Sequence, residues 1–288
     1  MPYLYLIISV FGIAASSIFG TYFNRKNLDK TDTIPLYSFM LHSTVLAFWA
    51  IMFIFDRTLD WKVVPYSLGF ALGFGVCSIS MVYALKTGPT VLTSLMLQLS
   101  LIGVTVWGFF FWNTVFTWIV ALGIILIVLS LWLCLYTKKQ EENKITWRWI
   151  FWVSLVFIGN ATCTIFQKTQ QMQFDGKYGN FMMMIASFCS MSFCLVMYLR
   201  SNKSDSKEII RTSWQYPVLA GTLNSIMNLC VILLATSVLS PSMVYPVLAV
   251  GSLAVTTIFS AFVFKEKMRW WQWLGVLVGA VAVALLSL

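Results

Sequence analysis

The sequence predicts an all-α integral membrane protein with ten transmembrane helices arranged as two inverted five-helix repeats. Its 288 residues are 59% hydrophobic and only 10% charged, whereas soluble domains average about 25% charged residues. Apolar runs of about 20 residues, the length that spans a bilayer, recur along the whole chain. The second half also repeats features of the first. These observations exclude an ordinary soluble protein and favour a multi-span membrane protein.

Apolar runs between charged or Pro/Gly-containing breaks define the expected helices. The first run lacks a basic n-region and a small-residue cleavage site, so we expect a retained helix rather than a signal peptide. Several Trp residues fall at the ends of the runs, as expected for an aromatic belt at the membrane interfaces. The ten predicted helices are residues 3–23, 34–55, 65–86, 90–112, 116–136, 149–168, 178–199, 214–236, 241–264 and 270–288.

An internal repeat relates the two halves. Shifting residues 83–133 by 152 positions places them on residues 235–285 and aligns Pro89 with Pro241. Gly123 then falls on Gly275, and a shift of 147 positions places Gly12 on Gly159. Prolines and glycines set backbone breaks and close approaches, so their agreement indicates a structural repeat.

The repeat predicts the organisation of the chain. We expect residues 1–136 to form the first five-helix repeat and residues 149–288 the second, joined by a polar linker at residues 137–148. Because five is an odd number of spans, the second repeat must enter the membrane from the opposite side.

Charge predicts the orientation and the partners. The loops after odd-numbered helices carry 15 of the 19 Lys and Arg residues, so the positive-inside rule places both termini outside the cytoplasm. The formal charge of +9 lies in short loops, where basic residues meet anionic lipid headgroups. We therefore expect the lipid bilayer as a partner and no nucleic acid.

Polar side chains inside the predicted spans mark the candidate site, because the hydrocarbon core offers them no water. Carboxamides near mid-membrane on helices of both halves favour a central cavity that binds substrate. Two tyrosines are candidates to contact a ring or aliphatic tail, and Pro246 is expected to break the ninth helix. A lone His is either a proton-linked or substrate-binding group or a buried side chain hydrogen-bonded to a neighbour. A hydroxyl such as Ser16 more commonly serves interhelical packing. The candidate substrate-binding residues are Asn224, Asn228, Gln98, Asn160, Tyr245, Tyr83, His42 and Ser16.

The residue types that are absent from the predicted spans limit which substrates and reactions are expected. No Asp or Glu lies in the central part of a predicted span, which argues for neutral or zwitterionic substrates over permanent cations. The six cysteines fall in apolar runs without a CxxC pair and are interpreted as packing residues. No catalytic constellation or metal-ligand spacing is found, so we predict neither an enzyme nor a bound metal or cofactor.

The chain resembles the drug/metabolite transporter superfamily, in particular its EamA-like ten-helix branch. The resemblance rests on the short join from Tyr83 to Thr90, the ending from Lys265 to Leu285, and the proline at 246 in the ninth helix. It implies a metabolite carrier that works by alternating access, with the fifth and tenth helices peripheral to a central cavity. Members of the branch usually have both termini in the cytoplasm, opposite to the orientation that the Lys and Arg count predicts.

Two functions remain open from the sequence. The favoured one is a secondary transporter or facilitator of a small polar, zwitterionic or amphipathic metabolite, amino acid-like first. The alternative is a noncatalytic accessory subunit or lipid-handling scaffold that assembles through Gly275 and Gly279 of the tenth helix. We expect a multi-pass protein of the bacterial cytoplasmic membrane, either a monomer or a homodimer through the fifth and tenth helices.

Overall fold

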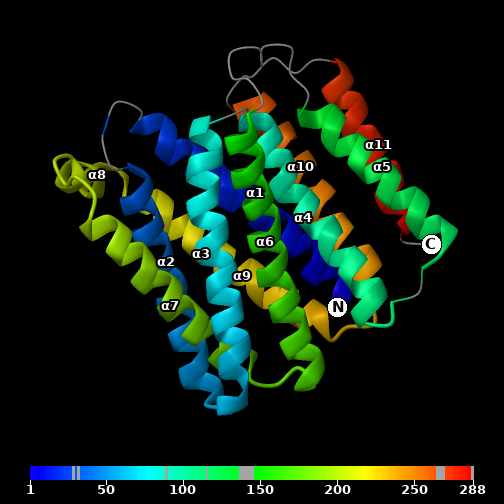
Figure 1. Ribbon diagram of the computed structural model, residues 1–288, viewed down its shortest axis with the longest axis horizontal. Coiled ribbons are helices and arrows are strands. Elements are labelled where there is room, and N and C mark those ends of the chain that lie inside the picture. Colours follow the sequence, from blue (N-terminus) through cyan, green and yellow to red (C-terminus); the bar gives the residue numbers. More distant parts are fainter. Residues whose placement is uncertain are drawn as a thin grey trace.

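The fold is a bundle of long helices, seen in a computed structural model (Figure 1). The structure describes residues 1–27, 30, 33–87, 90–114, 116–135, 146–263 and 270–286. Most of the predicted linker at 137–148 lies outside these residues. The first half contains α1 (Pro2–Lys26), α2 (Thr33–Asp56), a short 3-10 turn η1 (Trp61–Val63), α3 (Val64–Thr87), α4 (Thr90–Phe111) and α5 (Trp118–Leu135). The second contains α6 (Trp147–Gln173), α7 (Gly179–Leu199), α8 (Ser206–Ser213), α9 (Gln215–Ala235), α10 (Pro241–Val263) and α11 (Trp270–Leu286).

Length and composition make this a membrane protein with several spans. Seven described stretches are long and apolar enough to cross a bilayer: Pro2–Phe23, Thr33–Asp56, Trp61–Met81, Trp147–Gln173, Gly179–Leu199, Gln215–Ala235 and Pro241–Phe259. Three shorter apolar stretches, Met96–Phe111, Trp118–Leu133 and Trp270–Leu285, lie in α4, α5 and α11. The prediction of an all-α membrane protein is confirmed, whereas the count of ten spans stays a prediction.

The connection between α7 and α9 contains a short helix, α8, whose Ser206, Ile209 and Ser213 are buried while its other residues face outward. One sequence-based expectation about the helices was wrong. Pro246 was expected to break the ninth helix, yet α10 runs through it. A proline removes only one helical hydrogen bond, and neighbouring helices can accommodate the freed carbonyl.

The most extensive helix crossings join the two halves. Helix α3 packs along α6, and α1 packs along α9. A Cβ atom added to Gly159 of α6 would lie 2.7 Å from the carbonyl oxygen of Gly73 in α3. A Cβ added to Gly12 of α1 would lie 2.9 Å from the Cβ of Met227 in α9. Glycine is therefore required at these crossings, because any side chain would push the helices apart.

Helices α5 and α11 form a pair at one edge of the bundle, opposite α2 and α7 (Figure 1). Ser130 of α5 donates a hydrogen bond to the carbonyl oxygen of Gly275 in α11, with 2.7 Å between the oxygens. A Cβ on Gly279 would lie 2.4 Å from Val250 of α10 and 2.6 Å from Ser130. The two glycines that the scaffold hypothesis assigned to assembly are therefore occupied by packing inside the chain.

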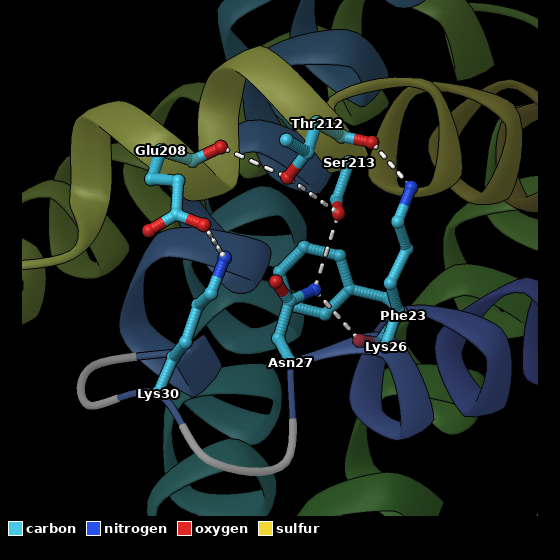
Figure 2. Close-up of polar contacts among 7 residues, drawn as sticks. All are labelled: Phe23, Lys26, Asn27, Lys30, Glu208, Thr212 and Ser213. Carbon is cyan, nitrogen blue, oxygen red and sulfur yellow. Dashed lines mark hydrogen bonds and ion pairs between the residues drawn. The ribbon is translucent and has the colours of Figure 1, made fainter.

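Polar contacts hold helix α8 against the end of α1 (Figure 2). Lys30 forms an ion pair with Glu208, with 2.8 Å between Nζ and Oε1. The Lys26 ammonium donates to the Thr212 carbonyl at 2.6 Å, and Asn27 donates to the Ser213 hydroxyl at 3.3 Å. Beneath α8, Ile209 is fully buried against Phe23 and Leu36. The short amphipathic helix thus covers the ends of α1 and α2.

Tryptophans at helix ends agree in part with the expected aromatic belt. Trp61, Trp118, Trp147 and Trp270 are largely exposed at the start of their helices, as expected for residues at the membrane interface. Trp149 also lies near the start of its helix, but it is buried, and its indole N–H donates to Thr93 at 3.0 Å. Its role is to join α6 to α4.

Candidate functional site

A cavity of about 460 Å³ lies at the centre of the bundle. Side chains from α1, α2, α3, α4, α6, α7, α9 and α10 line it, so both halves of the chain contribute four helices. Helices α5 and α11 contribute no side chain to the described lining. The walls combine Phe, Leu, Val and Met side chains with a small set of polar groups, the usual character of small-molecule sites.

Three carboxamides form a connected chain on one wall of the cavity. The Gln167 side chain on α6 donates to Oδ1 of Asn228 on α9, with 3.3 Å between the two atoms. Asn228 in turn donates to Oδ1 of Asn224 at 3.0 Å and to its backbone carbonyl at 2.9 Å. Asn224 and Asn228 share a face of α9 because they are four residues apart. These hydrogen bonds join α6 to α9, and the three carboxamides also line the cavity.

A fourth carboxamide lies on the α4 side of the cavity. Asn160 of α6 donates to the hydroxyl of Ser100 on α4 at 2.6 Å. Gln98, two residues before Ser100 on α4, also lines the cavity. Within the described part of the chain its side chain has no hydrogen-bond partner, so both its donor and its acceptor are available to a ligand.

His42 lines the cavity from α2. Its Nδ1 lies 2.8 Å from the Ser38 carbonyl oxygen and 3.8 Å from the sulfur of Cys194, and its ring packs 4.2 Å from that of Phe74. A carbonyl oxygen can only accept, so Nδ1 carries a hydrogen and Nε2 is left for another partner. This arrangement includes the hydrogen bond to a neighbour that the packing interpretation expects.

Tyr245 is the aromatic residue of the predicted set that reaches the cavity. It is 3% exposed and packs with its ring centroid 6.3 Å from that of Trp112. Nine consecutive residues around it on α10, 242–250, are buried. Its aromatic ring forms part of the cavity wall.

Two predicted residues lie elsewhere. Tyr83 is 46% exposed and stacks on Trp152 of α6, with 4.5 Å between the ring centroids. Ser16 donates to the carbonyl oxygen of Ala220 at 3.1 Å and so links α1 to α9. Neither is part of the cavity lining, whereas Asn224, Asn228, Gln98, Asn160, Tyr245 and His42 all line it.

The sequence-based site omitted several residues that the cavity brings together. Gln167 belongs to the same helical stripe as Asn160, and Ser187 and Ser190 form a three-residue spacing on α7. This spacing was visible in the sequence, but hydroxyls at such spacing are also common in packing seams. The described residues hold no group of three His, Cys, Asp or Glu side chains that could bind a metal ion.

Comparisons with known proteins agree with the helical architecture. The family model described as "EamA-like transporter family" matches residues 147–288. A solved structure described only as "Crystal structure of protein" superposes with a TM-score of 0.74. The match covers 99% of this chain and 95% of the other at 10% sequence identity, which makes it a likeness of fold. No curated protein matches the chain.

Proposed function

We propose that this chain, whose residues 147–288 belong to the EamA-like transporter family, is a secondary carrier for an amino acid-like metabolite. Membership of that family makes the protein a membrane transporter of small molecules. The substrate class and the mechanism proposed below rest on the cavity and on the way the helices pair.

The central cavity is the single observation that carries the proposal. It collects polar side chains from both halves of the chain, and carriers built from inverted repeats bind substrate between their repeats. Its volume of about 460 Å³ accommodates a small metabolite. Carboxamides on apolar helices that line a cavity are expected to have a function beyond packing.

The lining favours a zwitterionic or amphipathic substrate. Among the residues that the structure describes, its polar groups are carboxamides, hydroxyls, one thiol and one imidazole, with no Asp or Glu. Carboxamides can both accept from an ammonium and donate to a carboxylate, so they suit a small molecule carrying both groups. Apolar walls from Phe70, Phe74 and Met183 are suited to an aliphatic or aromatic portion.

The helix pairing supports two inverted repeats. Under an exchange of α1, α2, α3, α4 and α5 with α6, α7, α9, α10 and α11, the pair α3–α6 becomes α9–α1. The pair α2–α9 likewise becomes α7–α3, and α4–α6 becomes α10–α1; all of these pairs are in contact. A carrier built this way can expose its site alternately by exchanging the packing of its two halves.

In an alternating-access mechanism, the hydrogen bond between Gln167 of α6 and Asn228 of α9 would respond to the movement of the helices. Gln167 and Asn228 connect a helix of the α3–α6 pair with a helix of the α1–α9 pair. If these two pairs rock against each other, that bond must break or change partners. A substrate that takes the place of either carboxamide would link its own binding to the movement.

Binding and transport by purified protein test the proposal. A thermal-stability screen against amino acids and related metabolites is expected to find stabilising ligands, since a ligand at one hundred times its Kd adds about 2.7 kcal/mol. Asn228→Leu should abolish the stabilisation and uptake into proteoliposomes while the protein still folds. Thr222→Val, on α9 but outside the cavity lining, is the matched control and should keep both. Unchanged uptake by Asn228→Leu would refute the assignment of the cavity.

The cellular setting belongs to the same proposal. We place the protein in a bacterial cytoplasmic membrane, as a monomer or as a homodimer through α5 and α11. The outward faces of these helices are apolar, with Ile125, Leu277 and Val281 each more than half exposed. The Lys and Arg distribution favours termini outside the cytoplasm, and the family resemblance favours termini inside.

A further inference from the structure

A buried lysine lies beside the cavity. Lys168 of α6 is 7% exposed and follows Gln167, which lines the cavity. Its ammonium donates to the carbonyl oxygen of Ala235, the last residue of α9. Among the described residues no Asp or Glu lies within ion-pair distance of it. A buried ammonium with unused N–H donors is unfavourable unless further acceptors reach it.

A small void gives this lysine room for another partner. The void, about 10 Å³, is bounded by Lys168 together with residues of α9, α10 and the turn between them. Such a volume is close to the space that one water molecule needs. Tyr245 and Val231 line both this void and the central cavity, so these two side chains form the partition between them.

From this geometry we infer that Lys168 is the anion-binding subsite of the cavity and takes the carboxylate of the transported substrate, an inference that rests on the proposed carrier function. The carboxylate reaches the ammonium when the Tyr245 ring moves aside and joins the void to the cavity. The carboxamides of Asn224 and Asn228 then face the substrate's ammonium group.

The capped end of α9 explains why the lysine stays inward without substrate. The carbonyl groups at the end of a helix carry partial negative charge, and a cation there is favourable. A single carbonyl satisfies one of the three ammonium donors, whereas a carboxylate can accept from the others. Each charge-assisted hydrogen bond of this kind should change the affinity by roughly 10- to 140-fold.

The test compares two probes that differ only at the carboxyl group, L-leucine and L-leucinamide. Wild-type protein in lipid nanodiscs should bind L-leucine at least tenfold more tightly than L-leucinamide. Lys168→Gln removes the charge but keeps a donor, so it should bind the two probes equally and bind L-leucinamide as wild type does. Lys177→Gln, which neutralises an exposed lysine on the loop after α6, is the matched control and should keep the wild-type preference.

The outcomes separate the subsite from the carrier function. Equal binding of both probes by wild type, or a preference that survives in Lys168→Gln, would overturn the lysine subsite and leave the carrier proposal standing. Equal binding by wild type overturns the subsite even if Lys168→Gln does not fold. Absence of both binding and proteoliposome uptake of either probe by wild type would overturn the amino acid-like carrier and the subsite together.

Discussion

Replacing Gly73 by alanine should destabilise the protein, whereas the same change at Gly75 should not. Both glycines lie in α3, two residues apart, but only Gly73 faces α6. A Cβ at Gly73 would lie 2.8 Å from the carbonyl oxygen of Gly159 and 3.0 Å from the backbone nitrogen of Cys163. A Cβ at Gly75 would meet nothing within 4 Å.

The magnitude follows from these contacts. Alanine improves helix propensity over glycine by about 0.8–1.0 kcal/mol, and this gain applies equally to both positions. At Gly73 the added methyl meets backbone atoms, which cannot rotate away, and overpacking of this kind costs about 1–3 kcal/mol. The stability of the two variants should therefore differ by about 1–3 kcal/mol, with Gly73→Ala the weaker.

Thermal unfolding of the purified protein measures the difference. A change of 1 kcal/mol shifts Tm by roughly 2–4 °C in chains of 150–250 residues, so Gly73→Ala should melt roughly 2–12 °C below Gly75→Ala. Gly159→Ala, on the other side of the same crossing, should resemble Gly73→Ala. Equal apparent Tm values for the Gly73 and Gly75 variants would show that α3 and α6 do not cross as closely as described.

Two further predictions concern the edges of the bundle. Gly279→Ala should lower the apparent Tm by up to roughly 9 °C, because its Cβ would lie 2.4 Å from Val250 and 2.6 Å from Ser130, and the overpacking cost of about 1–3 kcal/mol exceeds the helix-propensity gain of about 0.8–1.0 kcal/mol; a change of oligomeric state at unaltered Tm, seen by size-exclusion chromatography with light scattering, would contradict the internal packing. The exposed ion pair between Lys30 and Glu208 should contribute only about 0.2–1 kcal/mol, since the Glu208 side chain is 65% exposed. Reversing either charge alone should lower the apparent Tm slightly and reversing both should restore it, and no recovery in the double variant would refute a direct pair.

The long apolar helices could be predicted from the sequence because each is a nearly unbroken apolar run. The C-terminal end of α6 could not be predicted in this way. The prediction stopped at residue 168, whereas the helix continues to Gln173 through a polar segment in which Gln170 and Gln171 are fully buried. Gln170 donates to the backbone carbonyl of Lys177, a contact with the following loop that hydropathy does not encode.

Part of the candidate site could be predicted because polar side chains near the middle of a membrane span are rare. Asn160, Asn224 and Asn228 were predicted as site residues for that reason, and all three line the cavity. Their partners depend on which helices meet, and a periodic pattern on one helix does not reveal this. The sequence could not distinguish the two predicted tyrosines either. Tyr245 lines the cavity, whereas Tyr83 stacks on Trp152 outside it.

The crossings of α1 with α9 and of α3 with α6 also constrain how the protein is made. Each glycine-lined face in the first half finds its counterpart only after the second half has entered the membrane. During synthesis, α1 and α3 therefore enter the membrane before α9 and α6, the helices that cover these faces, have been made. The two halves mature together, and the last helices to leave the ribosome complete the packing of the first.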